Sequence, residues 1–338
     1  MNFQNNIPEV IAEIGVNHDG SIDKAMALVD LVAEIGLPYA KFQVFQASKL
    51  VHRSAGCAPY QLRAVRTNTQ IEMLDDLAFS FSEFEKLAVH CEEVGVQFVA
   101  TPFDEDAVKF LADLQVPWIK VASGELTNYP LLRCIANTEI PVVLSTGMSS
   151  ISQISKALDI FRAIDRDLVC LKALMHCVSL YPTPTNLTNL RRIISLRKKF
   201  GVPIGYSDHT IGIEAAIIAG DLGVNLIEKH FTNDRSAKGP DHKASSTPEE
   251  FKALLKKLVA NRILLGDGEI SPSAQENEME FYARRVLIAT TEISAGDVFG
   301  YHNLSGIRAN YGLPIEVIDV VSGTVSQRSY LEGEIISL

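Results

Sequence analysis

The fold is decided by the stretch from Val10 to Phe45, VIAEIGVNHDGSIDKAMALVDLVAEIGLPYAKFQVF. Short apolar runs begin and end this stretch, at Val10–Gly15 and Tyr39–Phe45, and they have the length and composition of buried strands. Between them, Ile22–Ile35 repeats its apolar residues with the period of an amphipathic helix. Two strands joined in this way by a helix are typical of a parallel βαβ unit.

The same unit recurs along the chain. Six more strand-like runs follow, at Val96–Phe103, Trp118–Glu125, Pro141–Gly147, Leu171–Ser179, Val202–His209 and Leu226–Thr232. Amphipathic stretches separate them, at Ser82–Val94, Asp104–Leu114, Ile151–Ile164, Leu187–Phe200 and Ile211–Leu222. Eight strands alternating with helices, within about 260 residues, predict an α/β fold of the (β/α)8 TIM barrel type. A doubly wound parallel sheet is the alternative, and the absence of a GxGxxG turn after the first strand disfavours it.

The rest of the chain predicts a second, smaller domain. A last helical stretch, Thr247–Leu265, completes a barrel domain over residues 1–265. Gly, Pro, Gln and Glu residues then predict a linker over 266–282. From 283 to 338, short apolar runs alternate with turn residues. A domain of about 55 residues has little core, so we expect it to dock on a larger surface.

Composition limits the class of protein. Of 338 residues, 47% are apolar and 21% are charged, which are ordinary values for a globular protein and exclude a disordered or fibrous chain. No apolar run approaches the roughly 18 residues of a membrane helix, and MNFQNNIPEV lacks the pattern of a secretory signal. The five cysteines form no CxxC pair and suit free thiols in a reducing cytosol. With a net charge of −10, we expect a cytoplasmic protein without a nucleic-acid or membrane partner.

Polar residues collect where the predicted strands end, which is where TIM barrels hold their active sites. These residues are Glu13, Lys41, Gln43, Thr101, Lys120, Ser123, Glu125, Ser207, His209, Glu228 and His230. In Tyr39–Phe45, Lys41 and Gln43 alternate with Phe42 and Val44, so the polar face should point into the barrel mouth. Strict alternation would separate Lys120 from Ser123, so we expect a twist or bulge near Gly124.

Such a cluster suits a small anion and a metal ion. Lysines and hydroxyls bind phosphate, and two histidines on neighbouring strand ends, His209 and His230, can hold a divalent metal with open positions. Three alternatives stay open at this point. Lys41 could belong to a structural Lys–Glu pair, each histidine could be structural, and Lys41 or Lys120 could be the Schiff-base lysine of an aldolase.

Nine segments of the barrel form a recognisable series. They are, in order, AEIGVNHDGS, KFQVF, TPFDEDAV, IKVASGELTNYPLL, PVVLSTGMSS, HCVSLYPTP, IGYSDHT, IEKHFT and the GPDH at Gly239–His242. Together they resemble the sialic acid synthase family. The tail, with ISAGDVF and NLSGIRANYGLP, resembles the antifreeze-like (SAF) domain of that family. The resemblance implies condensation of phosphoenolpyruvate with an N-acyl mannosamine-type sugar, to give a nine-carbon 2-keto sugar acid and phosphate.

The resemblance also implies roles for individual residues. It implies Mn²⁺ or Mg²⁺ on His209 and His230, and a domain-swapped homodimer whose Arg308 acts on the partner's site. Catalytic residues would be Glu13, Lys41, Lys120 and Glu125. Phosphoenolpyruvate ligands would be Lys41, Thr101, Lys120, Ser123 and Ser207, and sugar ligands would be Glu13, Gln43, Glu125, Tyr181, Asp241 and Arg308.

Two departures from the family pattern concern the substrates. Ser179, which we expect to bind substrate, stands where members have Asn in HCTNxYPTP, and Arg308 is followed by ANYG where members read RPGxG. The NHDGS form favours the neuraminate and legionaminate branches over the pseudaminate branch, and we expect the loop Val51–Phe79 to contact the sugar. The alternatives are a related synthase of 3-deoxy sugar acids, which the SAF-like tail disfavours, and a non-catalytic sugar-binding protein of polysaccharide assembly, which the retained lysines and histidines disfavour.

Overall fold

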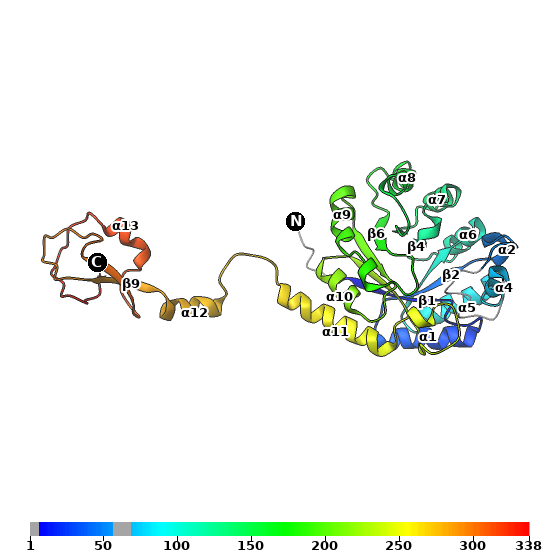
Figure 1. The fold of residues 1–338 in the computed structure, drawn as a ribbon, viewed down its shortest axis with the longest axis horizontal. Coiled ribbons are helices and arrows are strands. Elements are labelled where there is room, and N and C mark those ends of the chain that lie inside the picture. Colours follow the sequence, from blue (N-terminus) through cyan, green and yellow to red (C-terminus); the bar gives the residue numbers. More distant parts are fainter. Residues whose placement is uncertain (1–6, 57–68, 338) are drawn as a thin grey trace. The chain divides into compact units, whose positions relative to one another are not determined.

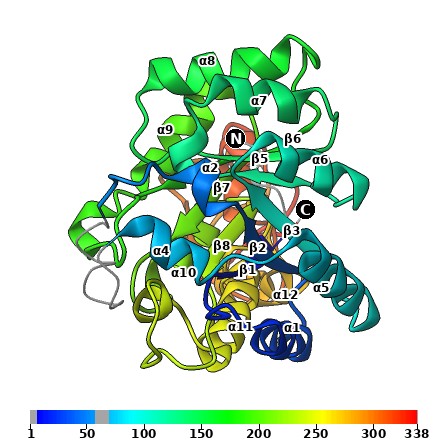
Figure 2. The ribbon, with the colours of Figure 1, turned by 90° about the vertical axis from the view of Figure 1, so that its right-hand side faces the viewer.

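A closed parallel barrel forms the larger part of the molecule in the computed structural model, which describes residues 7–56 and 69–337. Within these ranges, eight strands close in sequence order (Figures 1 and 2). They are β1 (Glu9–Gly15), β2 (Tyr39–Val44), β3 (Gln97–Pro102), β4 (Ile119–Val121), β5 (Val142–Ser145), β6 (Leu171–Cys177), β7 (Ile204–Asp208) and β8 (Leu226–His230). Parallel pairing of β8 with β1 closes the ring. The predicted TIM barrel is confirmed, and the doubly wound alternative is excluded.

Helices surround the ring of strands (Figure 2). They are α1 (Ile22–Ile35), α5 (Phe81–Glu93), α6 (Glu105–Asp113), α7 (Tyr129–Ala136), α8 (Ile151–Arg162), α9 (Arg191–Phe200), α10 (Glu214–Asp221) and α11 (Pro248–Leu265), with short α2 (Ala47–Leu50) and α4 (Gln70–Asp75) after β2. Local signals set the bounds of α1: the Ser21 side chain accepts a hydrogen bond from the Lys24 backbone N–H, and Gly36 ends the helix at φ 81°.

The sequence analysis missed α7, α2 and α4. No described helix is long and apolar enough to cross a membrane.

The barrel has two apolar layers separated by the strands. Outside, Phe42 and Val44 pack with the helices. Inside, a smaller cluster fills the barrel interior with Ile11, Tyr39, Val99, Trp118, Val143, Ala173, Met175 and Leu226. Because side chains alternate along a strand, Tyr39 and Lys41 share the inner face of β2. Apolar residues therefore fill part of the interior, and the polar inner positions follow them toward the carboxyl ends of the strands.

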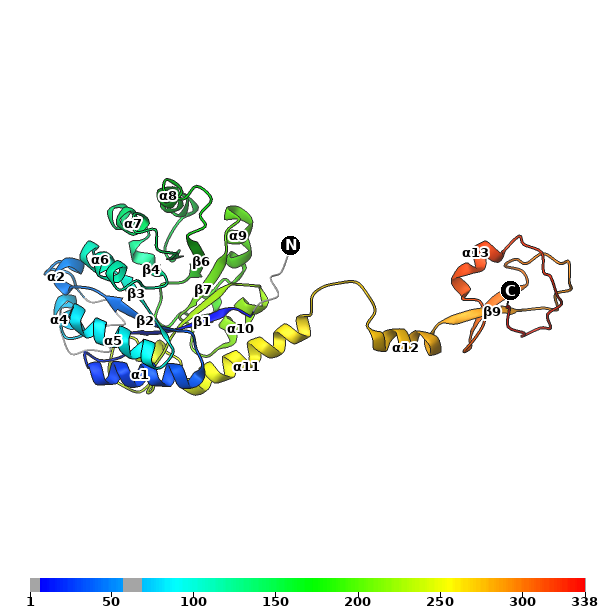
Figure 3. The same ribbon diagram turned by 180° about the vertical axis from the view of Figure 1, so that it is seen from behind.

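The chain divides into two compact units, Met1–Asp267 and Gly268–Leu338. The second unit contains α12 (Ala274–Ala283), the antiparallel strands β9 (Arg285–Ala289) and β10 (Leu304–Arg308), and α13 (Ile318–Val321) (Figure 3). Its own core consists of Leu287, Ala289, Ile293, Phe299, Leu304, Val321, Tyr330 and Ile336. Much of the expected linker is helical, since Ser273 and Glu276 form a capping box at the start of α12. The division at 265 and 283 and the SAF assignment stay predictions.

Candidate active site

Lys41 lies at the centre of a buried charged cluster inside the barrel. Its Nζ is 2.6 Å from Glu13 Oε2 and 3.7 Å from Glu228 Oε2, and it donates to Thr101 Oγ1 at 3.1 Å. Gln43 Nε2 donates to the other Glu13 oxygen at 2.9 Å. The polar face predicted for Tyr39–Phe45 is confirmed, because all of these contacts lie inside the ring. The Lys–Glu pair exists, but it is one contact of a larger network.

Glu228 joins the two lysines. Its Oε1 is 3.3 Å from Lys120 Nζ and accepts a hydrogen bond from Ser207 Oγ at 3.0 Å. Burial alone would raise the pKa of Glu228, but Lys120 and Lys41 outweigh burial and hold that pKa at about 2. Burial lowers the pKa of Lys120, and it raises the pKa of Glu13 despite Lys41. This cluster therefore brings two cations and two carboxyl groups together out of water.

His209 and His230 face each other next to this cluster, with ring centroids 5.3 Å apart. The Nδ1 of His209 is 2.8 Å from the Val178 carbonyl oxygen, so Nδ1 donates and Nε2 keeps its lone pair. The Nδ1 of His230 is buried, makes no hydrogen bond and lies 3.5 Å from Asp241 Oδ2. The Tyr181 ring lies 4.1 Å from the His209 ring and 5.6 Å from the His230 ring, between centroids. Burial, and next the neighbouring His209, lower the pKa of His230, which favours a neutral imidazole.

The two histidines fit a divalent ion as ligands, although they do not form a complete cage. The orphaned Nδ1 of His230 and the Nε2 of His209, which lies 3.4 Å from Ser207 Oγ, are the kind of nitrogen that binds a metal. Among the described residues, no group of three or more His, Cys, Asp and Glu side chains has the arrangement of a metal centre. A metal held by this pair would therefore take its other ligands from substrate and water.

A fully buried ion pair fixes the ends of β7 and β8 that carry the histidines. Asp208 and Lys229 are cross-strand partners, and Asp208 Oδ2 is 3.0 Å from Lys229 Nζ. Asp208 Oδ1 also accepts from Tyr206 OH at 3.1 Å, and Lys229 Nζ donates to the Thr210 carbonyl at 2.8 Å. Both side chains are 0% exposed. Because neighbours along a strand point to opposite faces, the Asp208–Lys229 pair lies on the outer face of the ring, and His209 and His230 lie on the inner face. The pair therefore fixes the strand ends that carry the two histidines.

Ser123 and Ser179 converge on Gly147. The backbone N–H of Gly147 donates to Ser123 Oγ at 3.0 Å, and a Cβ atom at position 147 would lie 2.3 Å from Ser179 Oγ. The twist or bulge expected near Gly124 takes the form of a turn. β4 ends at Val121, and a 3-10 turn over Ser123–Glu125 redirects the chain there.

The remaining predicted residues lie at different places. Glu125 accepts from Asn128 Nδ2 at 2.7 Å at the start of α7. Asp241 follows β8, and burial together with Glu13 raises its pKa to about 6. Arg308 lies exposed on β10 of the second unit, so the barrel unit itself does not contain it. Part of the predicted sugar loop, residues 57–68, lies outside the described residues.

The sequence analysis did not identify Ser145 and Cys177 as candidate site residues, and it gave Glu228 no role. Ser145 ends β5, is 1% exposed, and its Oγ has no hydrogen-bond partner. Cys177 ends β6 with its Sγ 3.9 Å from His209 Nδ1. Glu228 is among the polar residues at the predicted strand ends but has no predicted role, and it bridges both lysines. The STGM turn after β5 was the available signal for Ser145, because a small polar residue at a strand end fits a barrel site.

Comparisons with known proteins place this TIM barrel among the enzymes of the sialic acid synthase class. The family model described as the NeuB family matches residues 28–270. The N,N'-diacetyllegionaminic acid synthase of Campylobacter jejuni is 35% identical, covering 97% of this chain and 98% of that protein. The enzyme of the same name from Legionella pneumophila is 36% identical, covering 94% and 90%.

A solved structure gives the same result. The crystal structure of N-acetylneuraminic acid synthetase from Leptospira borgpetersenii, in complex with citrate, has a TM-score of 0.72 and 33% identity, covering 82% of this chain and 92% of that one. The chain therefore belongs to the NeuB family. The resemblance to sialic acid synthases is confirmed, and the protein is an enzyme of the nonulosonic acid synthase type.

Proposed function

We propose that this protein condenses phosphoenolpyruvate with an N-acyl mannosamine-type sugar to give a nine-carbon 2-keto sugar acid and phosphate. The observation that carries the proposal is the buried pair Lys41 and Lys120, joined through Glu228 inside the barrel. Two lysines in one water-poor site are suited to a small ligand with two anionic groups, such as the phosphate and carboxylate of phosphoenolpyruvate. Relatives named for synthesis of legionaminic and neuraminic acids support the choice of reaction.

The chain's own groups suit each stage of this reaction. Thr101, Ser123 and Ser207 would donate hydrogen bonds to phosphoenolpyruvate, and the orphaned hydroxyl of Ser145 would gain a partner. The enol carbon attacks the aldehyde carbon of the open-chain sugar, and water adds at C2. Phosphate then leaves from the tetrahedral intermediate by cleavage of the C–O bond. Glu13, whose burial raises its pKa, would transfer a proton.

A divalent metal, Mn²⁺ or Mg²⁺, belongs to the proposal, and synthases of this family are generally metal-dependent. His209 and His230 would hold the metal, which supplies a Lewis acid that polarises the aldehyde oxygen. The Val178 carbonyl fixes the His209 tautomer, as carbonyls beside metal-binding histidines commonly do.

Sugar recognition and assembly complete the proposal. Gln43, Glu125, Tyr181 and Asp241 would contact the sugar in the barrel mouth. Arg308, on the second unit, would reach the site of the partner subunit in a cytoplasmic homodimer, with the second unit acting as a SAF domain. A planar guanidinium suits hydrogen bonding to sugar hydroxyls or to the acyl oxygen.

Phosphate release is the direct test. The full-length protein is assayed with phosphoenolpyruvate against N-acetylmannosamine, its 6-phosphate and a 6-deoxy-2,4-diacetamido sugar, and the product mass is determined. We expect phosphate to be released from phosphoenolpyruvate in the presence of one of these sugars. We also expect Lys41→Met and Lys120→Met to raise the KM for phosphoenolpyruvate strongly. Turnover only with shorter phosphorylated aldoses would indicate the 3-deoxy sugar acid reaction. Sugar binding without turnover would indicate the non-catalytic alternative, and substrate-dependent inactivation by borohydride would indicate an aldolase.

Metal removal gives a separate prediction. Exhaustive chelation should abolish phosphate release, and Mn²⁺ or Mg²⁺ should restore it. His209→Ala should lower kcat by several orders of magnitude, because a Lewis acid supplies several kcal/mol of transition-state stabilisation. Metal binding itself is measured by Mn²⁺ electron paramagnetic resonance, where His209→Ala should leave more free ion. Full activity in a metal-free sample would contradict the proposal.

A further inference from the structure

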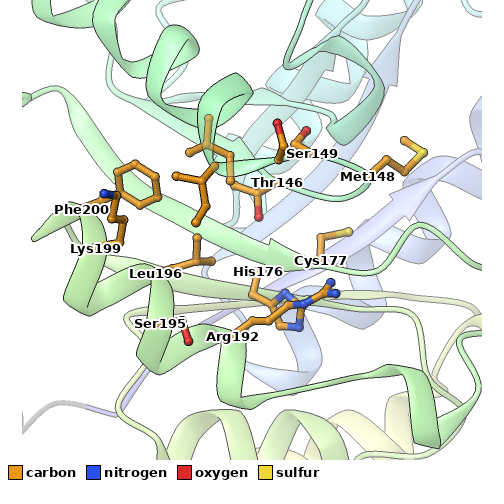
Figure 4. Close-up of a pocket in the computed structure, with 13 residues that line it drawn as sticks. Thr146, Met148, Ser149, His176, Cys177, Arg192, Ser195, Leu196, Lys199 and Phe200 are labelled. Atoms are coloured by element: carbon orange, nitrogen blue, oxygen red, sulfur yellow. The ribbon is translucent and has the colours of Figure 1, made fainter.

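A second cavity lies on the flank of the barrel, between α8 and α9, and Figure 4 shows the side chains around it. Its volume is about 440 Å³, within the range of small-molecule sites, roughly 300–1,000 Å³. Thr146, His176 and Cys177, which follow or end β5 and β6, line it from the barrel side. Neither lysine of the candidate active site lines this cavity, and Cys177, whose sulfur also lies 3.9 Å from His209 Nδ1, stands between the two.

The charged side chains among the described residues that line the cavity, Arg192 and Lys199, are both cationic. Arg192 and Lys199 lie seven residues apart on α9, which is close to two turns, so they share a helix face with Leu196 between them. No Asp or Glu is among the described residues that line the cavity. In the part of the chain that the structure describes, neither Arg192 nor Lys199 forms an ion pair, although the whole chain has a net charge of −10. The lining therefore offers two cations that an anionic group could bind.

The rim is apolar and includes an unusual backbone conformation. Met148 is 75% exposed and Ile151 is 58% exposed. Met148 has φ 61°, a left-handed conformation that costs a residue with a side chain roughly 1–2 kcal/mol. Strained residues of this kind cluster at ligand sites, where the strain holds a side chain in place. Exposed apolar side chains thus lie at the edge of the cationic lining.

We propose that this cavity is a binding site for a small amphipathic anion. A carboxylate, phosphate or sulfonate group binds Arg192 or Lys199, and an apolar body packs on Met148, Ile151 and Leu196. The proposal does not depend on the reaction catalysed in the barrel mouth. It does place a ligand against Cys177, whose sulfur also lies beside His209.

The probe is 8-anilinonaphthalene-1-sulfonate, an aromatic sulfonate whose fluorescence rises on binding, titrated against the full-length protein. We expect one saturable site per chain. The double variant Arg192→Gln and Lys199→Gln should weaken binding at least tenfold. The matched control, Arg191→Gln and Lys198→Gln, removes the same charge from the same helix but not from the cavity lining, and it should stay within twofold of the unmodified protein.

Two further measurements test whether the probe contacts the apolar rim and whether it binds outside the phosphoenolpyruvate site. Ile151→Ser should weaken binding without any change of charge, and saturating phosphoenolpyruvate should not displace the probe. The proposal is overturned if both double variants bind alike, if phosphoenolpyruvate displaces the probe, or if binding is unsaturable. All four substituted cations are exposed, so circular dichroism should show an unchanged fold.

Discussion

Gly147 shows how closely single atoms are packed in the candidate active site. An added Cβ would lie 2.3 Å from Ser179 Oγ and 2.7 Å from Ser123 Oγ. Gly147→Ala should displace both hydroxyls and raise the KM for phosphoenolpyruvate about tenfold, equivalent to about 1.4 kcal/mol. Steady-state kinetics measures this. The matched control is Gly124→Ala beside Ser123, where an added Cβ meets nothing within 4 Å. Equal effects of the two substitutions would contradict the argument.

His18 links the pH to the stability of the barrel. Its ring is buried and stacks on Phe79 at 4.1 Å between centroids, and its Nδ1 accepts a hydrogen bond from the Gly20 backbone N–H. Burial lowers the pKa of His18 to about 4. Between pH 6.5 and 4 the unfolded chain therefore binds a proton at His18 that the folded chain does not. The free energy of unfolding should fall as the pH is lowered through this window, by up to about 3 kcal/mol.

Urea unfolding at pH 7 and pH 4.5 measures this dependence, and His18→Phe provides the comparison. Phenylalanine keeps the stacking but cannot be protonated, so that variant should lose this part of the pH dependence even if its stability at pH 7 is lower. An unchanged difference between the two pH values would show that other groups cause it.

At the scale of elements, the Asp208–Lys229 pair couples β7 to β8. Asp208→Asn leaves the Lys229 cation buried without its anion, and the free energy of unfolding should fall by about 3–5 kcal/mol. The double variant Asp208→Asn with Lys229→Met removes both charges, while Asn keeps an acceptor for the Tyr206 hydroxyl. It should recover about 2 kcal/mol of that loss, because apolar replacement of a buried pair is often neutral. Urea unfolding of the two single variants and the double variant measures the coupling, and simple additivity would show that there is none.

At the scale of the whole molecule, the proposed dimer predicts complementation between two inactive variants. Glu13→Ala disables the barrel site, and Arg308→Ala disables the second unit's contribution. Each homodimer should be nearly inactive. Mixing after reversible dissociation should form heterodimers with one intact site, so activity should return to roughly one quarter of the unmodified value, since half the dimers are mixed and each has one of two sites. If heterodimers form without activity, Arg308 acts within its own chain or has no catalytic role.

The sequence by itself determined the order of the eight barrel strands, most of the helices between them and the polar inner face of β2. These features depend on local signals: alternation along strands, the 3.6-residue period of helices, and caps such as Ser21 and Gly36. It also identified the two lysines and the two histidines as one group, because parallel strands in a barrel end at the same edge. The family motifs added the sugar and phosphoenolpyruvate ligands, which the structure leaves as proposals.

Only the tertiary structure decided how those residues are connected. Glu228 bridges Lys41 and Lys120 because barrel closure brings β8 next to β1 and within reach of β2 and β4, far apart in sequence. The 3-10 turn after β4, the orphaned hydroxyl of Ser145 and the cationic cavity beside α9 were equally beyond the sequence. Each depends on side chains from different βα units meeting at angstrom distances, and those distances are set by how the closed barrel packs, which no local pattern in the chain records.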